Sequence, residues 1–233
     1  VVAVGGDGTL NEVVSGLRRE TNVGLVPVGT ANVVARDLKI PFDPIKAAEV
    51  VAGGTTRTID VGRVGPRRFV AMVGVGFDGE IVRAVSDART GPITQLAYVR
   101  PSFRVLAEHE PKPLRLFVDD IPVEGDVFGV FVCNTRGYGG HFSVTPDATM
   151  DDGLLHYVAW RKGARRHLLR YAFAALLRSK SGAATYGSGR RFRVESANGR
   201  EVMAQADGDP LGRTPLDIEV LPGAVRIFVP PTR

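Results

Sequence analysis

A glycine-rich turn near the start of the chain constrains its fold more than any other stretch. A short apolar run, Val1–Val4, leads into Gly5–Thr9 (Gly-Gly-Asp-Gly-Thr), and an amphipathic segment follows with Val13, Val14 and Leu17 on one face. This order predicts a buried strand, a tight loop and a helix. Glycines let the backbone come close to a ligand, and the start of a helix presents unpaired N–H groups. The turn therefore suits phosphate, although a plain strand-to-helix connection has the same pattern.

The first sixty residues continue to alternate strand and helix signals. A second apolar run, Val23–Val28, precedes Gly29-Thr30-Ala31-Asn32, and a further apolar-periodic segment follows. Asp43 and Pro44 are the N-cap and first-turn proline of another helix. Strands and helices in this order are typical of a parallel α/β sheet.

From about Thr55 the pattern changes to short strand-like runs separated by turns. The runs are Arg57–Val64, Arg68–Val75, Leu114–Val118, Val127–Cys133, Leu154–Trp160, Arg191–Glu195, Glu201–Ala206, Leu216–Leu221 and Val225–Val229. They predict a β-sandwich after about residue 60, with helical insertions at about 79–88, 93–109 and 164–180. Pro101 is expected to kink or break the second insertion. Asn198-Gly199 predicts a hairpin between the runs on either side of it.

The glycine-rich turn resembles a signature shared by diacylglycerol, sphingosine and ceramide kinases and, more distantly, by NAD kinases and phosphofructokinases. Gly29–Asn32, Pro146–Leu155 and Ala206–Pro210 are similar to further segments of the bacterial diacylglycerol kinase-like lipid kinases. The resemblance covers nearly the whole chain. It implies an α/β plus all-β fold, in which an NAD kinase/phosphofructokinase-like nucleotide-binding domain precedes a β-sandwich domain.

The resemblance also implies domain limits. Residues 1–60 would be the nucleotide-binding α/β domain, residues 61–224 the β-sandwich lipid kinase domain, and residues 225–233 a strand that returns to the first domain. The chain opens inside a strand pattern without Met, so we expect the N-terminal part of the first domain to be missing. The family's Asn-Pro-x-x-Gly loop, a further phosphate contact, would lie there.

The two glycine-containing loops are the expected nucleotide site. The residues implied to hold ATP are Gly5, Gly6, Asp7, Gly8, Thr9, Leu10, Asn11 and Thr30, with Asp7 near the reacting groups. Thr30 could also cap the helix that follows it. The family has Asp-Phe or Asp-Leu where this chain has Val33-Val34, so the family's acid is absent at this position.

Asp207-Gly208-Asp209 resembles the family's Asp-Gly-Glu segment. Two carboxylates beside a glycine can accept the proton of an attacking hydroxyl and orient it. The resemblance favours Asp209 as the base, on a side chain one methylene shorter than the family's Glu, and leaves Asp207 as the alternative. Without the resemblance, an acidic β-turn is the expected structure.

A structural magnesium site is implied in the loop before Leu155. The carboxylate of Asp152 and the backbone carbonyls of Thr149 and Leu154 would bind Mg²⁺, and Asp60 would join through water. Carboxylate and carbonyl oxygens are the ligands that hard cations prefer. The spacing alone indicates an ordinary Asp-Asp-Gly turn.

Gly74–Gly79 fits the pattern G-x-G-x-x-G of dinucleotide-binding loops. No acid follows about 20 residues later to bind a ribose, and the region lacks a clear βαβ pattern, so we reject a dinucleotide site. The segment resembles the family's Gly-Phe-Asp segment, and close backbone packing is the favoured explanation for its glycines.

The formal charge of +5 favours an anionic partner. Residues 164–180 combine apolar residues on one side with basic residues on the other, as in helices that lie on anionic membranes. The apolar residues are Leu168, Leu169, Phe173, Leu176 and Leu177, and the basic ones within and beside the segment are Arg161, Lys162, Arg165, Arg166, Arg170, Arg178 and Lys180. Core packing is favoured for the apolar side and membrane contact for the arginines.

The remaining expectations concern partners and location. Few aromatic residues lie among the basic ones, so nucleic acid is not an expected partner. One cysteine, Cys133, and no apolar run of about 18 residues indicate a cytoplasmic protein. The basic amphipathic segment and the resemblance to lipid kinases imply a peripheral position at the inner membrane face. A homodimer is left open.

Together these observations predict an ATP- and Mg²⁺-dependent lipid kinase acting on diacylglycerol or a related lipid. NAD kinase is the second enzyme that the first loop allows. A lipid-binding module with a kinase-like fold and no activity is the third interpretation, since a phosphate-contacting segment is expected upstream.

Overall fold

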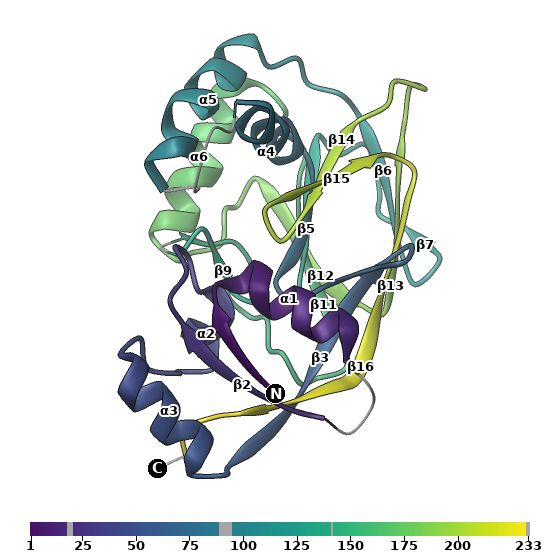
Figure 1. The fold of residues 1–233 in the computed structure, drawn as a ribbon. Helices are drawn as coiled ribbons and strands as arrows, with labels where there is room; N and C mark the ends of the chain where they lie inside the picture. Colours follow the sequence, from purple (N-terminus) through teal and green to yellow (C-terminus); the bar gives the residue numbers. More distant parts are fainter. Residues whose placement is uncertain (18–20, 89–94, 141, 232–233) are drawn as a thin grey trace.

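The computed structural model describes residues 1–17, 21–88, 95–140 and 142–231 (Figure 1). Its first unit is a layered α/β arrangement. Two parallel strands, β1 (Val2–Gly5) and β2 (Asn22–Pro27), alternate with the helices α1 (Asp7–Gly16), α2 (Val33–Asp37) and α3 (Pro44–Ala52). The carboxylate of Asp43 accepts hydrogen bonds from the first free amides of α3, as the sequence predicts.

Two long strands connect this unit to the rest of the molecule. β3 (Thr56–Val64) and β16 (Leu216–Phe228) pair in antiparallel fashion along nearly their whole length. The last residues of β16, Arg226 and Ile227, also pair in parallel with β2. The first half of β16 pairs instead with β13 (Arg191–Ser196). One eight-stranded sheet therefore runs through both units.

The second unit is a sandwich of two sheets. On one side, β3 also pairs with β4 (Arg67–Phe69), and β13 is followed in the sheet by β6 (Leu114–Val118) and β7 (Ile121–Pro122). The facing sheet has six strands in the order β12-β11-β8-β5-β14-β15. Their bounds are β12 (Ala184–Gly189), β11 (Leu155–Trp160), β8 (Gly129–Cys133), β5 (Met72–Gly76), β14 (Met203–Ala206) and β15 (Asp209–Arg213). A short ribbon of β9 (Gly137–Tyr138) and β10 (Phe142–Ser143) lies outside both sheets.

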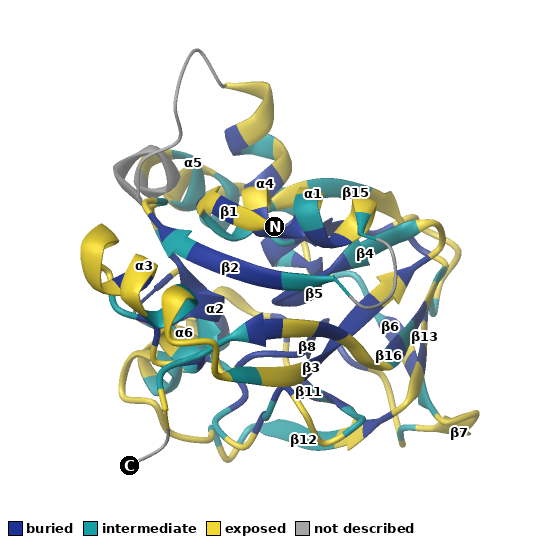
Figure 2. Ribbon diagram, turned by 60° about the horizontal axis from the view of Figure 1, so that its bottom comes forward, coloured by how far each residue is buried: buried dark blue, intermediate teal, exposed yellow. Residues whose placement is uncertain are grey.

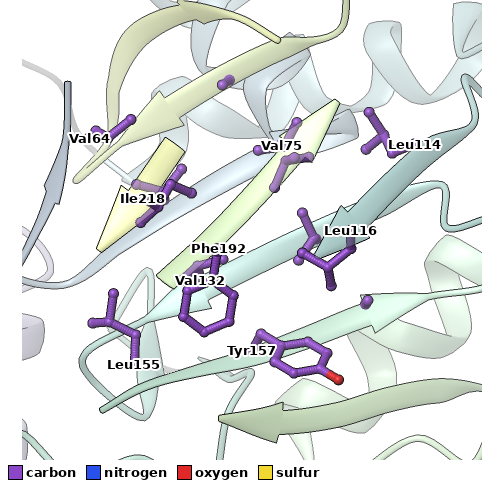
Figure 3. Close-up of a cluster of buried hydrophobic side chains, with 14 of the residues drawn as sticks. Val64, Val75, Leu114, Leu116, Val132, Leu155, Tyr157, Phe192 and Ile218 are labelled. Atoms are coloured by element: carbon purple, nitrogen blue, oxygen red, sulfur yellow. The ribbon is translucent and has the colours of Figure 1, made fainter. Parts of the chain in front are cut away.

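Alternating side chains of the two sheets fill the space between them (Figure 3). Leu116 and Phe192 come from the first sheet and Val132 and Leu155 from the second, and each of these four is at most 2% exposed. A separate core lies between β1, β2 and the helices of the first unit, and it includes Ile227 of β16. These layers confirm the predicted fold class, an α/β unit followed by a β-sandwich.

Three helices gather at one end of the sandwich: α4 (Phe77–Asp87), α5 (Gln95–Glu108) and α6 (Arg165–Leu176) (Figure 1). α5 continues through Pro101 without a break. Residues 93–94, which the sequence assigned to this helix, lie outside the described residues. No helix of the described ranges is long and apolar enough to cross a membrane.

Two sequence expectations are wrong. The apolar side of α6 does not pack into the core: Leu168 is buried, whereas Leu169, Phe173, Leu176 and Leu177 are 52–62% exposed, and Figure 2 shows the helix largely in the exposed colour. The predicted hairpin at Asn198-Gly199 does not form either. β13 and β14, on either side of that turn, belong to different sheets, so the turn carries the chain across the sandwich.

Candidate functional site

The loop between β1 and α1 exposes a row of backbone amides. The first hydrogen bond of α1 runs from Leu10 N–H to Gly6 O, so the amides of Asp7, Gly8 and Thr9 have no partner within the helix. A Cβ placed on Gly8 would meet no atom within 4 Å, so this side of the loop is open. Free N–H groups at a helix start suit the oxygens of a phosphate group.

A second loop lies directly against the first. A Cβ on Gly29 would come 2.3 Å from Gly6 Cα, so the two backbones touch at a point where no side chain fits. Asn32 holds this second loop in shape, since its Oδ1 accepts from Gly29 N–H and its Nδ2 donates to Gly29 O. Both loops follow parallel strands, whose carboxyl ends form the usual ligand edge of an α/β sheet.

Asp7 joins the two loops. Its carboxylate accepts hydrogen bonds from the amides of Val33 and Val34, at 2.9 and 3.0 Å. Asp7 thereby caps α2 across the loop contact, whereas the sequence pattern suggests Thr30 for that role. The contact uses only the backbone N–H groups of Val33 and Val34. It therefore does not need the acidic side chain that the family has in this segment.

Leu10 and Asn11 lie behind the open side of the loop. Leu10 is 1% exposed and packs in the first core, and its amide is used within α1. Asn11 is 7% exposed, and its buried Oδ1 has no hydrogen-bond partner in the described part of the chain. Leu10 and Asn11 therefore support the loop from its buried side, whereas Gly8, Thr9 and Thr30 are exposed.

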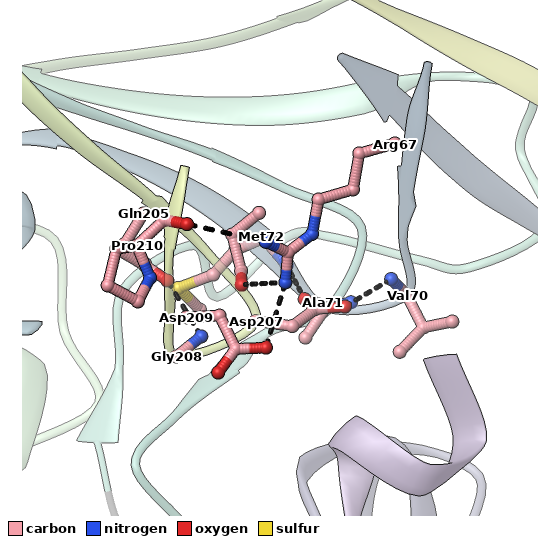
Figure 4. Close-up of polar contacts among 10 residues, drawn as sticks. Arg67, Val70, Ala71, Met72, Gln205, Asp207, Gly208, Asp209 and Pro210 are labelled. Atoms are coloured by element: carbon pink, nitrogen blue, oxygen red, sulfur yellow. Dashed lines mark hydrogen bonds and ion pairs between the residues drawn. The ribbon is translucent and has the colours of Figure 1, made fainter. Parts of the chain in front are cut away.

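The acidic turn at residues 207–209 is a tight hairpin between β14 and β15. Asp207 and Gly208 both have positive φ, 50° and 87°, as a type I′ turn requires. The carboxylate of Asp207 accepts three backbone hydrogen bonds of 2.7–2.9 Å from Val70, Ala71 and Met72 (Figure 4). The hairpin is thereby fastened to the segment that leads into β5.

Electrostatics link this hairpin to the first loop. The pKa of Asp207 is raised to about 6, mainly by burial and also by the charge of Asp7, although the hydrogen bonds from the three amides lower it. The charge of Asp7 also raises the pKa of Asp37 in α2, which is raised mainly by burial. Arg68 of β4 donates to Val14 O in α1 at 2.9 Å, so α1 and the neighbourhood of the hairpin are in contact. The structure therefore brings Asp7 and Asp207 within electrostatic reach of each other.

Asp209 is the more accessible acid of the turn. Its side chain is 60% exposed and forms an ion pair with Arg67 at 2.8 Å. Arg67 also donates to Ala206 O and Pro210 O on the two strands of the hairpin (Figure 4). Sequence reasoning missed Arg67, because no local pattern marks an arginine of β4 as a partner of a turn about 140 residues later.

The predicted magnesium loop is held by donors of the chain itself. The carboxylate of Asp152 accepts from Leu154 N–H at 3.0 Å, contacts His156 Nε2 at 2.8 Å and bonds the hydroxyl of Thr149. The pKa of Asp152 is lowered, since these contacts outweigh the effect of burial, which raises it.

Asp60 is equally engaged. Its two carboxylate oxygens accept from the amides of Gly153 and Gly223, at 2.7 and 2.8 Å. Each carboxylate oxygen of Asp152 and Asp60 therefore already contacts one group of the chain, and the four-residue magnesium site stays a prediction from resemblance. No step below passes through a metal at this loop.

Comparison with known proteins identifies two family matches. Residues 1–64 match the diacylglycerol kinase catalytic domain, and residues 71–229 match the YegS C-terminal NAD kinase beta sandwich-like domain. Together they cover both structural units and leave residues 65–70, in the region of β4, between them.

Individual relatives agree with these matches. The chain is 34% identical to a diacylglycerol kinase of Bacillus subtilis over 76% of its own length and 59% of that protein. It is 31% identical to a Pseudomonas aeruginosa protein named "Probable lipid kinase YegS-like", over 99% of this chain and 76% of that one. A solved structure of a diacylglycerol kinase from Bacillus anthracis has the same fold, with a TM-score of 0.73 at 21% identity over 99% of this chain and 76% of the other.

Proposed function

Because the chain belongs to the diacylglycerol kinase-like family of lipid kinases, we propose that it transfers the γ-phosphoryl group of Mg·ATP to the hydroxyl of diacylglycerol or a related lipid. One observation carries this proposal. Open amides at the start of α1 lie within electrostatic reach of an acidic hairpin from the far end of the chain. Phosphoryl transfer requires a protein mainly to position two substrates and to neutralise charge. The amides would act on the phosphate donor and the hairpin on the acceptor.

On the donor side, the amides of Asp7, Gly8 and Thr9 bind phosphate oxygens of the nucleotide. Magnesium would be part of the Mg·ATP substrate and would supply charge neutralisation on the phosphates. Asp7 holds the two loops together through α2 and so fixes the direction in which the amides point.

On the acceptor side, Asp209 accepts the proton of the lipid hydroxyl. As the hydroxyl oxygen bonds to the γ-phosphorus, the bond to the bridging oxygen of ADP breaks and ADP leaves with that electron pair. Exposure of Asp209 supports this choice over Asp207, whose carboxylate is held by three amides. The guanidinium of Arg67, paired with Asp209, is available to neutralise the phosphoryl group in transit.

Substitution of the two acids tests these roles. Asp209→Asn should lower kcat by about 100-fold or more, in the range of a lost general base, with an unchanged melting temperature. Asp207→Asn should lower the melting temperature as well, because an amide cannot accept three backbone N–H groups equally. Asp217→Asn is the matched control, since Asp217 is an exposed, ion-paired acid of the same half of the molecule. Full activity of Asp209→Asn would reject Asp209 as the base.

The acceptor is tested with radiolabelled ATP and a panel of diacylglycerol, sphingosine, ceramide, phosphatidylinositol and NAD. Labelled phosphatidic acid is the expected product. Label on NAD alone would favour the NAD kinase alternative. No transfer by this chain or by a chain extended upstream, together with retained lipid binding, would favour a binding module without activity.

The lipid would be reached at an anionic membrane surface, with α6 as the contact. Four apolar side chains of α6 and its C-terminal end are more than half exposed: Leu169, Phe173, Leu176 and Leu177. Arg165, Arg166, Arg170 and Arg178 lie exposed on the same helix and just beyond it. Exposed apolar residues next to arginines are typical of helices that lie in the headgroup region of anionic bilayers.

Vesicle sedimentation tests this contact. The protein should sediment with phosphatidylglycerol vesicles and much less with phosphatidylcholine vesicles, and Phe173→Ser combined with Arg170→Glu should abolish the difference. Ile121→Ser is the control, because Ile121 on β7 is at least as exposed as Phe173, at 69% against 62%. Unchanged sedimentation of the double variant would reject α6. A loss of dimer mass in that variant without lipid would assign the patch to a second copy of the chain.

A further inference from the structure

A buried acid outside the proposed catalytic pair faces the same hairpin. Asp78 lies in the first turn of α4, is 3% exposed, and accepts hydrogen bonds from Tyr138 Oη and from Gln205 Nε2, the latter at 2.7 Å. A Cβ on Gly74 would come 2.1 Å from Asp78 Oδ2, so the glycine of the preceding strand makes room for this carboxylate. A buried carboxylate is costly, and burial raises the pKa of Asp78 to about 6.

Gln205 carries the contact onward to the acidic turn. It is 1% exposed on β14, and its Oε1 accepts from the amide of Gly208 at 2.8 Å. Gly208 is the residue between Asp207 and Asp209. The side-chain amide of Gln205 therefore links the Asp78 carboxylate to the backbone of the turn.

The carboxylate decides which way that amide points. An ionised carboxylate has acceptors and no donor, so it faces the NH2 end of Gln205. The carbonyl end is then left for Gly208 N–H. If Asp78 were replaced by an apolar group, the amide could turn over and present donors to Gly208, whose N–H would lose its acceptor.

We propose that Asp78 and Gln205 are positioning residues, which fix the hairpin turn so that Asp209 faces the phosphate loops. The proposal rests on the proposed kinase function. Neither side chain touches the reacting groups, so their effect passes through the backbone of Gly208. Small displacements of a catalytic group lower the rate of transfer more than they lower substrate binding.

The test compares kcat with KM in four variants. Asp78→Ala and Gln205→Leu should each lower kcat by about tenfold or more with KM for ATP within about twofold. Gln205→Glu keeps an acceptor for Gly208 but should still lower kcat, because its carboxylate cannot donate to Asp78 and repels it. Asp78→Asn should keep kcat within about threefold of the wild-type value. Its carbonyl still accepts from Gln205, and its amide can donate to the Tyr138 oxygen. Val194→Ala, which opens a cavity in the sandwich core, is the control for lost stability alone.

Amide hydrogen exchange at Gly208 provides a second readout that does not depend on activity. Exchange should accelerate in Asp78→Ala and Gln205→Leu and stay slow in Asp78→Asn and Val194→Ala. Unchanged kcat in the first two variants would overturn the proposal, as would an equal loss of kcat in Val194→Ala. An inactive wild-type protein would overturn the proposed function instead. Hydrogen exchange at Gly208 would then be the test of the contact between Gln205 and the turn.

Discussion

At the scale of single residues, substitutions of two glycines distinguish effects on folding from effects on ligand binding. Gly29→Ala would place a methyl group 2.3 Å from Gly6 Cα, so the two loops must move apart. Overpacking of this kind costs about 1–3 kcal/mol. We expect a lower melting temperature and loss of ATP binding together, measured by thermal unfolding and isothermal titration.

Gly8→Ala is the matched change on the open side of the same loop. The added methyl meets no atom within 4 Å, and alanine in the first turn of α1 should stabilise the helix by up to about 1 kcal/mol. If phosphate lies against this face, ATP affinity should nonetheless fall by about tenfold, or about 1.4 kcal/mol. Unchanged ATP affinity in this stable variant would place the nucleotide elsewhere.

Asp78 should make stability depend on pH in a predictable direction. Its pKa is about 6 in the folded protein against 3.8 for an ordinary aspartate. Between about pH 4 and pH 6 the folded state keeps a proton that the unfolded state has released, so stability falls as pH rises through this window. At about 1.4 kcal/mol per pKa unit, the loss approaches about 3 kcal/mol.

Asp78→Asn removes this contribution. Urea unfolding at pH 4 and pH 7 should show the variant gaining up to about 3 kcal/mol relative to wild type as pH rises. A difference between the two proteins that does not change with pH would mean that burial does not raise the pKa of Asp78.

At the scale of elements, two turn dipeptides show what the sequence can predict about strand connections and what it cannot. Asn198-Gly199 and Asp207-Gly208 are both dipeptides that favour tight hairpins. The structure uses the second for the β14–β15 hairpin and the first for a crossing between sheets. A turn signal predicts that the chain reverses, but which sheet receives the next strand depends on pairing with distant strands such as β5. For the same reason the amides of Val70–Met72 could not be predicted as partners of Asp207.

The loop between residues 149 and 156 should be held without a metal ion. The Asp152–His156 contact and the neighbouring donors occupy the carboxylate that the resemblance assigned to Mg²⁺. The melting temperature of the nucleotide-free protein should therefore be the same in EDTA and in millimolar Mg²⁺.

His156→Ala should lower the stability by about 1–2 kcal/mol, because it leaves a carboxylate oxygen without its donor. Arg83→Ala, which breaks an exposed ion pair with the same four-residue spacing, should cost less than about 1 kcal/mol. A wild-type melting temperature that rises with Mg²⁺ would instead support the magnesium site at Asp152.

At the scale of the whole molecule, the two units share β3 and β16 rather than a flexible linker. The glycine-rich loop and the acidic turn were predictable from local residue patterns and resemblance, since each is a short contiguous segment. The ties between them were not predictable, because Asp7 to Val33, Arg68 to Val14 and Arg67 to Asp209 join segments that lie apart in the sequence. The relative position of donor and acceptor sites therefore depends on the shared strands.

Asp60 lies where these strands pass from one unit to the other. It is 3% exposed in β3, and its carboxylate binds Gly223 in the irregular segment of β16 and Gly153 in the loop before β11. Asp60→Ala leaves the amides of Gly153 and Gly223 without this acceptor, in hydrogen bonds that are partly buried. At about 1.5 kcal/mol for each hydrogen bond to a charged group, we expect a loss of about 3 kcal/mol.

Calorimetry decides whether this residue also couples the two units. Wild-type protein should unfold in one transition, because neither unit keeps its sheet without β3 and β16. Asp60→Ala should broaden or divide that transition, and ATP should then raise the midpoint of the first unit alone. Val194→Ala serves again as the control, since it weakens only the sandwich core and should shift a single transition. If Asp60→Ala lowers the midpoint while one sharp transition remains, the coupling lies in the strand pairs themselves and not in this carboxylate.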